Sequence, residues 1–264
     1  MKVELRHEQI LKLLEKKGIL SVGELAHCFA LSVVTIRKDL DDLAREGLLQ
    51  RTFGGAVFSN RSLFNSFFRE SARQDSQQKH AIASAAMEYI QDGDTVILDA
   101  GTTTLALAQL LKEELKSAFI ITCSVPAALE LSSAGYDILL LGGIVRNKSL
   151  ALLGRETLTV LEHYRADKAC LGSSGFTAER GHSTPNLEHA QIKEAIIRAS
   201  EQTYVLVDSS KYGHNWLSSF TRLRDVALTI TDSQLTRRKQ KALENVGAKL
   251  RIADLRRRNS RQYD

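Results

Sequence analysis

Short, uninterrupted apolar runs alternate with helical patterns over most of the chain, from Thr95 to Asp254. An apolar run without polar alternation is typical of a strand buried on both faces, and such strands occur in parallel sheets that helices cover. The sequence therefore predicts an α/β domain with a mostly parallel sheet. The expected strands are Thr95–Asp99, Phe119–Cys123, Asp137–Gly143, Lys168–Gly175, Tyr204–Ser210, Val226–Asp232 and Lys249–Asp254. The expected helices between them are Thr102–Leu115, Val125–Ala134, Arg155–His163, Leu187–Glu201 and Ser233–Val246.

Residues 4–47 show three amphipathic patterns in succession. The first predicts a helix over Glu4–Lys17 that ends at Gly18. Ser21 and Glu24 have the spacing of a capping box, which predicts the start of a second, short helix. Ser32 is a suitable N-cap for a third helix, which the glycine at position 47 ends. The apolar faces hold Ile10, Leu13 and Leu14, then Val22, Leu25, Ala26 and Phe29, then Ile36, Leu40 and Leu43.

The third helix leaves one face free, and polar groups gather in its N-terminal half, which is the half that a recognition helix places in the major groove of DNA. That face carries Val34, Thr35, Arg37, Lys38 and Asp42. The following residues, 48–58, alternate around Gly54 and Gly55, which permit the positive φ angles of a tight hairpin. A lone Arg37 or Lys38 is more typical of a solvated helix charge. The three helices followed by a hairpin wing favour contact with DNA.

Two motifs in this region resemble the N-terminal domain of the DeoR family of bacterial sugar-operon regulators. They are S-V-V-T-I-R-K-D-L from Ser32 to Leu40 and R-T-F-G-G-A from Arg51 to Ala56. The resemblance implies a winged helix-turn-helix over residues 1–58. We interpret Asp39 as a helix-stabilising partner and not as a base reader. The residues expected to face DNA are Ser21, Ser32, Val34, Thr35, Arg37, Lys38, Arg51, Thr52, Gly54 and Gly55.

Residues 59–78 form a connector that lacks regular periodicity and yet carries Leu63, Phe64, Phe67 and Phe68. These side chains either pack against the second domain or a partner subunit, or belong to a partly ordered linker with one helical turn. A helix over Lys79–Ile90, with Ile82 and Ala86 on its apolar face, is expected to begin a domain spanning residues 79–254. Residues 255–264 form a basic tail, which is more typical of a solvated end than of a phosphate-binding arm.

Polar and glycine residues collect where the predicted strands end, in five loops that a parallel sheet brings to one edge. After the first strand, D-A-G-T-T-T places a glycine and three hydroxyl residues at the start of a helix. Unpaired N–H groups and the helix dipole favour an anion there, and phosphate fits that description. The loops are Asp99–Thr104, Thr122–Ser124, Gly142–Gly143 with Arg146, Gly172–Gly175 and Asp208–Lys211.

The same loops are similar to those of DeoR-type sensor domains, which resemble sugar-phosphate isomerases in fold. The resemblance implies that Gly101, Thr102, Thr103 and Thr104 hold a phosphate. It places Asp99, Ser124, Arg146 and Lys211 near the sugar, and we include Gly142 and Gly172 in the effector site. Two positions depart from the family pattern: Cys123, where asparagine is common, and His189, where an acidic residue is usual.

Composition adds a few exclusions. No apolar run approaches the roughly 18 residues needed to span a bilayer, and the N-terminus is polar, so we expect a cytoplasmic protein. Cys28, Cys123 and Cys170 are widely spaced in apolar surroundings, which predicts core residues and neither disulfides nor a metal site. We expect no cofactor. The net charge of +5 decides little, because residues 1–58 are nearly balanced and the tail carries much of the surplus.

Three functions remain to be compared. The leading hypothesis is a repressor of a sugar operon that leaves double-stranded operator DNA when a phosphorylated sugar binds, acting at least as a homodimer because two recognition helices must reach successive major grooves. A tetramer is equally compatible. The second is a sugar-phosphate isomerase with Asp208 or Glu188 as base and Lys211 or Lys193 as electrophile. The third is an RNA-binding protein, which the lack of an aromatic stacking stripe disfavours.

Overall fold

The computed structural model describes residues 3–45, 48–58, 71 and 74–255. The chain divides into two units, Met1–Arg69 and Glu70–Asp264. The predicted connector side chains Leu63, Phe64, Phe67 and Phe68, the glycine predicted to end the third helix, and nearly all of the basic tail lie outside the described residues.

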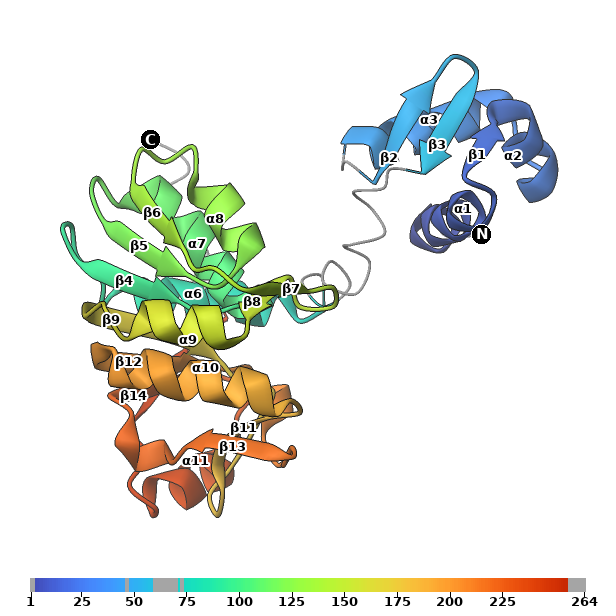
Figure 1. Cartoon of the computed structure of the whole chain (residues 1–264). Helices are drawn as coiled ribbons and strands as arrows, with labels where there is room; N and C mark the ends of the chain where they lie inside the picture. The colour runs from blue at the N-terminus through green and yellow to red at the C-terminus, as the bar shows by residue number, and fades with distance from the viewer. Residues whose placement is uncertain (1–2, 46–47, 59–70, 72–73, 256–264) are drawn as a thin grey trace, which may run out of the picture. The chain divides into compact units, whose positions relative to one another are not determined.

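The first unit consists of helices around one three-stranded antiparallel sheet (Figure 1). Its elements are α1 (Val3–Lys17), β1 (Ile19–Ser21), α2 (Val22–Phe29), α3 (Val33–Arg45), β2 (Leu49–Thr52) and β3 (Gly55–Phe58). The three helices and the wing are as predicted, whereas β1 is too short to give a sequence pattern. It pairs with β3, so the sheet order is β1-β3-β2.

Most residues of the apolar faces predicted from helical spacing form the core of this unit. Leu13, Ala26 and Phe29 are only partly buried against it, and the prediction that Cys28 is a core residue is wrong, because its side chain is exposed. Ile10, Leu25, Ile36 and Leu40 are all at most 1% exposed. Leu43 from α3 and Ala56 from the wing complete a single hydrophobic cluster, so the wing packs onto the helices.

The two wing glycines serve different purposes, which refines the expectation that both adopt positive φ. Only Gly54 does, with a φ of 88°. Gly55 lies in β3, where a Cβ would overlap the carbonyl oxygen of Leu20 in β1. The backbone conformation therefore favours glycine at the first position, and the close approach of a neighbouring strand requires it at the second.

The second unit is built on a seven-stranded, fully parallel sheet of order β15-β14-β12-β9-β4-β5-β6. This confirms the predicted α/β class. The strands are β4 (Thr95–Leu98), β5 (Phe119–Thr122), β6 (Asp137–Leu140), β9 (Ala166–Gly172), β12 (Ser200–Leu206), β14 (Leu228–Asp232) and β15 (Leu250–Ala253).

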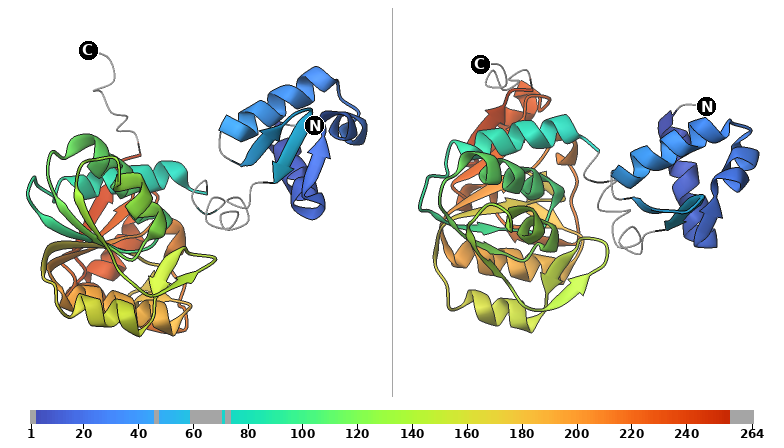
Figure 2. Two further views of the ribbon diagram at one scale, coloured as in Figure 1. Left: turned by 45° about the horizontal axis from the view of Figure 1, so that its top comes forward. Right: turned by 90° about the horizontal axis from the view of Figure 1, so that it is seen from above.

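Helices cover both faces of this sheet, as two of the views show most plainly (Figure 2). They are α6 (Ser76–Met87), α7 (Thr102–Glu114), α8 (Val125–Leu131), α9 (Arg155–Leu161), α10 (Leu187–Arg198) and α11 (Arg237–Glu244). Val96 and Leu98 of β4 pack in the cluster that contains α6, α7 and α8, whereas Ile97 packs with α9 and α10. Successive residues of one buried strand thus serve opposite layers, which explains the uninterrupted apolar runs.

Two small antiparallel additions were not predicted. One is the hairpin of β7 (Ile144–Arg146) and β8 (Ala151–Leu153). The other is a sheet of β10 (Gly175–Thr177), β11 (Gly181–Thr184) and β13 (Ser218–Thr221). Each strand has only three or four residues, too few for periodicity to show. Two 3₁₀ turns, Ser209–Lys211 and Leu223–Asp225, complete the unit.

Two elements end or begin at residues other than those predicted, because a side-chain hydrogen bond turns the chain there. The strand expected over Lys168–Gly175 ends at Gly172, and β10 begins at Gly175, because Ser173 Oγ donates to the Gly175 carbonyl and turns the chain. The last helix begins at Arg237 and not at Ser233, since Asp232 Oδ1 accepts from the N–H of Gln234 and holds a turn there.

Candidate functional site

The N-terminal half of α3 is presented to solvent as predicted. Ser32 caps the helix, accepting from the N–H of Thr35 at 3.1 Å, with the two hydroxyls 2.9 Å apart. Val34 is 75% exposed, and Arg37 and Lys38 are exposed while Ile36 and Leu40 are buried. The side chains of Arg37 and Lys38 can donate hydrogen bonds to base edges or phosphates. The exposed face of α3 is therefore a candidate surface for reading DNA.

The helix before it begins with the predicted capping box. Ser21 Oγ accepts from the N–H of Glu24 at 3.2 Å, and Glu24 Oε2 accepts from the N–H of Ser21 at 2.7 Å. The hydrogen bonds that the Ser21 N–H and hydroxyl donate to this carboxylate lower the pKa of Glu24. Because the Ser21 hydroxyl is used in the cap, its first role in the structure is to start α2.

Asp39 lies on the buried side of α3 and joins it to α1. Arg6 donates to both carboxylate oxygens, at 2.7 and 2.8 Å, and His7 Nε2 lies 3.1 Å from Oδ1. Burial opposes ionisation of Asp39, but these hydrogen bonds lower its pKa. The sequence suggested a helix-stabilising partner, whereas the structure makes Asp39 the link between the first and third helices.

Arg51, predicted to touch the DNA backbone, contacts its own unit. Its Nη1 donates to the Gly55 carbonyl at 2.9 Å, and its Nε lies 2.9 Å from Asp41 of α3. The side chain is 31% exposed. Arg51 therefore ties the wing to the recognition helix. Thr52 is half-buried and Gly54 is exposed, so they lie at the outer end of the wing.

In the second unit, the strand order reverses between β4 and β9, which are hydrogen-bonded neighbours. From β4 the chain continues to β5 and β6 on one side, and from β9 to β12, β14 and β15 on the other. Ligands of open parallel sheets bind beyond the carboxyl ends of the strands at such a reversal. Asp99 follows β4 directly and Gly172 ends β9, so two of the predicted effector-site positions flank this point.

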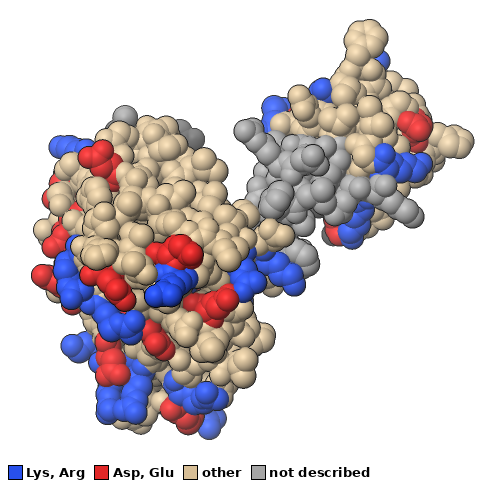
Figure 3. Space-filling model, viewed as in Figure 1, with Lys and Arg blue, Asp and Glu red and all other residues tan. Residues whose placement is uncertain are grey.

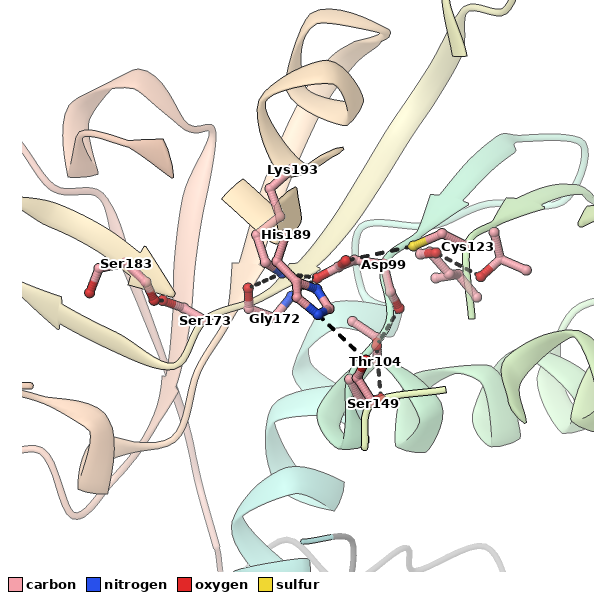
Figure 4. A network of polar contacts seen from close by, with 12 residues as sticks. Asp99, Thr104, Cys123, Ser149, Gly172, Ser173, Ser183, His189 and Lys193 are labelled. Atoms are coloured by element: carbon pink, nitrogen blue, oxygen red, sulfur yellow. Dashed lines mark hydrogen bonds and ion pairs between the residues drawn. The ribbon is translucent and has the colours of Figure 1, made fainter. Parts of the chain in front are cut away.

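Asp99 is the centre of a polar network at this point (Figure 4). The N–H of Gly172 donates to its Oδ2 at 3.0 Å, and Cys123 Sγ lies 3.8 Å from its Oδ1. Lys193 of α10 forms an ion pair with the same carboxylate and donates to the Gly172 carbonyl at 2.9 Å. Asp99 is 1% exposed, so its carboxylate lies below the surface of the site and holds these groups in position. Burial and the nearby Asp99 raise the pKa of Cys123 to about 12, which keeps the thiol protonated.

The start of α7 lies beside this network. Thr104 Oγ1 donates to the carbonyls of Asp99, at 2.7 Å, and Gly101, at 3.0 Å. No side chain caps the helix at its N-cap, Gly101. Gly101 and Thr102 are half-buried, whereas Thr103 and Thr104 are buried. The loop thus combines a fixed shape with backbone N–H groups that no side chain of the described residues caps, which suits an anion.

The N-terminal turns of α10 face the same region. His189 and Lys193 are four residues apart and so share one face of the helix. His189 Nε2 lies 3.4 Å from Ser149 Oγ, and its pKa is lowered by burial and by Lys193. Arg146 of β7 forms an ion pair with Glu188. The predicted effector site did not include Lys193, His189 or Ser149. Lys193 was named only as a possible electrophile of an isomerase, and His189 only as a departure from the family pattern, although the His-x-x-x-Lys spacing could have suggested both.

The other predicted effector residues lie at the same edge of the sheet in different roles. Ser124 is buried and caps α8, accepting from the N–H of Ala127 at 3.2 Å. Gly142 is exposed, and its carbonyl accepts from Thr157. Lys211 is half-buried in a 3₁₀ turn. Burial lowers the pKa of Lys79, and the charge of Lys211 adds to that effect. None of these three has a hydrogen bond to Asp99 in the described part of the chain.

Two features that the described ranges lack bear on other classes of protein. These ranges contain no helix that is both long and apolar enough to cross a membrane. They also contain no group of three His, Cys, Asp or Glu side chains that could hold a metal ion. On the face of the larger unit in view, positive and negative side chains are interspersed (Figure 3).

Family models match both units. Residues 6–62 match the DeoR-like helix-turn-helix domain, and residues 74–233 match the DeoR C terminal sensor domain. Ribose 5-phosphate isomerase A from Methanocaldococcus jannaschii is similar over 52% of this chain and 55% of that one, with 20% identity and a TM-score of 0.39.

Several regulators are similar over nearly the full length. The HTH-type transcriptional regulator YulB of Bacillus subtilis (strain 168) is 36% identical over 98% of this chain and 100% of the relative. The Glycerol-3-phosphate regulon repressor of Escherichia coli (strain K12) is 31% identical over 88% and 92%. A putative aga operon transcriptional repressor of Escherichia coli O157:H7 is 29% identical over 93% and 92%. The resemblance predicted from the motifs is thereby confirmed: the chain belongs to the DeoR family of DNA-binding transcriptional regulators.

Proposed function

We propose that this regulator represses a carbohydrate operon and leaves its operator when a phosphorylated sugar binds at the carboxyl edge of the parallel sheet. The observation that carries the proposal is the start of α7 at Gly101. It lies at the reversal of strand order, it lacks a side-chain cap, and Gly101 and Thr102 are half-buried and not sealed. The names of two relatives, repressors of a glycerol-3-phosphate regulon and of an aga operon, support the same class.

In this proposal the residues of the Asp99–Thr104 loop divide the work. The backbone N–H groups of Thr102 and Thr103 receive the phosphate, with the helix dipole favouring its charge. Thr104 shapes the turn, because its hydroxyl already donates to two carbonyls. Asp99 positions the loop against Gly172 and Lys193, so it acts on the effector indirectly.

The sugar end of the effector extends toward α10 and the β7–β8 hairpin. Arg146 is 49% exposed in its ion pair with Glu188, so it is able to exchange that partner for an anionic or hydroxyl group of the effector. Lys211, which follows β12, and Gly142, which follows β6, lie on opposite sides of the β4–β9 reversal and belong to the predicted set. Ser124 contributes through the position of α8.

Release from DNA requires the effector to favour one arrangement of paired DNA-binding units. We propose a homodimer at least, because two recognition helices must reach major grooves about 34 Å apart. A tenfold change in operator affinity needs only ~1.4 kcal/mol of differential binding of the effector to the two arrangements.

The test is a thermal-shift screen of the purified chain against phosphosugars and the matching unphosphorylated sugars. A phosphosugar is expected to raise the melting temperature, and its parent sugar is not. Thr102→Glu places a carboxylate at the proposed phosphate position and is expected to abolish the shift without weakening operator binding. Thr236→Glu is the matched control, because Thr236 is the exposed N-cap of α11 and also makes no side-chain cap. If a phosphosugar raises the melting temperature of Thr102→Glu as much as that of the wild type, the effector site lies elsewhere.

We further propose that the chain is not an isomerase. Two of the candidate acids and bases are engaged with other residues: Lys193 with Asp99, and Glu188 with Arg146. Asp208 accepts hydrogen bonds from Ser210. Incubation of the pure protein with ribose 5-phosphate is expected to give no ketose, and measurable turnover would revive the enzyme.

A further inference from the structure

We propose that Phe53, at the tip of the wing, enters the minor groove of the operator next to the major groove that α3 occupies. Phe53 was not among the residues that the sequence assigned to DNA. The inference rests on DNA binding by the first unit and is independent of any effector.

The exposure of Phe53 has no explanation within the fold. It is fully exposed, at 111% of its reference surface, between Thr52 and Gly54 at the end of the β2–β3 hairpin. The turn does not call for it either, because two-residue hairpin loops favour glycine, asparagine and aspartate. A large aromatic side chain there is therefore available to a partner.

The wing holds this side chain on a rigid support. The Gly54 carbonyl, adjacent to Phe53, accepts from the N–H of Val22 at 2.9 Å and so fixes the tip to the start of α2. Gly55 lies against the Leu20 carbonyl with no room for a Cβ. Arg51 ties β2 both to Gly55 and to Asp41 of α3. The tip consequently keeps its position relative to the recognition helix, and little order has to be gained on binding.

The chemistry of the tip favours a groove over a phosphate. Arg51, the nearest cation in the wing, points back to Asp41 and Gly55, and Thr52, Phe53 and Gly54 carry no charge. An uncharged tip gains little from phosphates. The minor groove is about 6 Å wide, which admits a single flat ring but not a helix, and proteins use phenylalanine there as an apolar wedge. With α3 in the major groove, the wing tied to it reaches the flanking minor groove.

The test uses the full-length chain and a duplex that the wild-type protein selects from a random library. Phe53→Ala is expected to weaken binding about tenfold, as for a central aromatic contact. The dependence of affinity on salt is expected to keep its slope, because no phosphate contact is lost. Arg37→Ala is the contrast, since its slope is expected to fall by about one if the guanidinium contacts a phosphate. Leu5→Ala, which removes an exposed apolar side chain of α1, is the matched control and is expected to bind as the wild type does.

Two further measurements locate the contact. Hydroxyl-radical footprints should lose protection in one minor groove of each half-site in Phe53→Ala. Replacing adenine there with 2,6-diaminopurine adds an amino group to the minor groove only, so it should weaken the wild type more than Phe53→Ala. Phe53→Trp is expected to retain binding, with emission from the new indole changing when DNA is added.

The possible outcomes distinguish a failure of DNA binding from a failure of the role given to Phe53. If the wild-type chain selects no duplex, DNA binding itself fails. If it selects one and Phe53→Ala binds within twofold of the wild type, only the role of Phe53 is overturned. A changed sedimentation mass of Phe53→Ala, with its affinity for DNA per dimer unchanged, would assign Phe53 to contact between copies and overturn the proposal as well.

Discussion

Lys193 and Asp99 form a buried ion pair across the point where the strand order of the parallel sheet reverses. Their side chains are 6% and 2% exposed, and they come from α10 and from the end of β4. Lys193 also donates to the Gly172 carbonyl at the end of β9. One lysine therefore fixes two neighbouring strand ends and the helix that covers them, which is the geometry on which the proposed effector site depends.

Lys193→Met should destabilise the larger unit by about 3–5 kcal/mol, because it leaves the Asp99 carboxylate buried without its cation. The measurement is urea unfolding followed through Trp216, the single tryptophan of the chain, which lies in this unit. Lys112→Met is the control. It breaks the ion pair with Glu130. The side chains of Lys112 and Glu130 are 36% and 31% exposed, so the loss should cost less than about 1 kcal/mol. Equal losses in the two variants would contradict the role given to Lys193.

Asp39→Asn should weaken the first unit and operator binding together. The change leaves the buried Arg6 guanidinium, which Asp39 binds through both oxygens, without a counter-charge, at a cost of about 3 kcal/mol or more. Hydrogen exchange of the α1 and α3 amides reports the loss of stability, and a retardation assay reports binding. Glu8→Gln, which breaks an exposed ion pair with Lys12 within α1, should change neither. Normal exchange in Asp39→Asn would mean that the link between α1 and α3 contributes little.

Arg37→Ala should reduce operator affinity by about 1–3 kcal/mol if the exposed guanidinium reads a base or a phosphate. Fluorescence anisotropy with labelled duplex, measured at several salt concentrations, separates these roles. Loss of a phosphate contact lowers the salt slope, whereas loss of a base contact relaxes sequence preference. Arg45→Ala, at the other end of α3, is the control. Unaltered anisotropy curves for Arg37→Ala would remove it from the DNA surface.

His182 should make the stability of the larger unit depend on pH. It is fully buried between Phe176 and Phe220, and burial together with Lys193 lowers its pKa to about 3. In the unfolded chain a histidine titrates near 6.5, so unfolding takes up a proton between about pH 6.5 and pH 3. Stability contributed by neutral His182 is thus complete above pH 6.5 and decreases as pH falls, by about 2 kcal/mol at pH 5.

The check compares urea unfolding at pH 7 and pH 5. His182→Gln is expected to lose less stability than the wild type between the two values, whatever its stability at pH 7. His163→Gln, which changes an exposed histidine, should retain the wild-type difference. Parallel pH profiles for the wild type and His182→Gln would show that His182 is not the source.

Local patterns were sufficient to predict the helices of the first unit, the wing and every strand of the parallel sheet. The reason is that each of these depends on neighbours in sequence: Ser21 caps with Glu24, and the apolar residues of Thr95–Leu98 must be buried on both sides. The short strands of the β7–β8 hairpin and of the β10–β11–β13 sheet were missed, since their pairing partners supply most of what defines them.

The site shows the same division. Sequence alone determined that hydroxyl and glycine residues follow the strands, and that α3 carries Arg37 and Lys38 on its free face. Only the tertiary structure decided what these groups touch. Arg51 pairs with Asp41, Asp99 joins Gly172 and Lys193, and Phe53 is left fully exposed. The physical reason is that local spacing fixes the face on which a side chain lies, while the partner of a charge or a ring is set by elements tens of residues away in the chain.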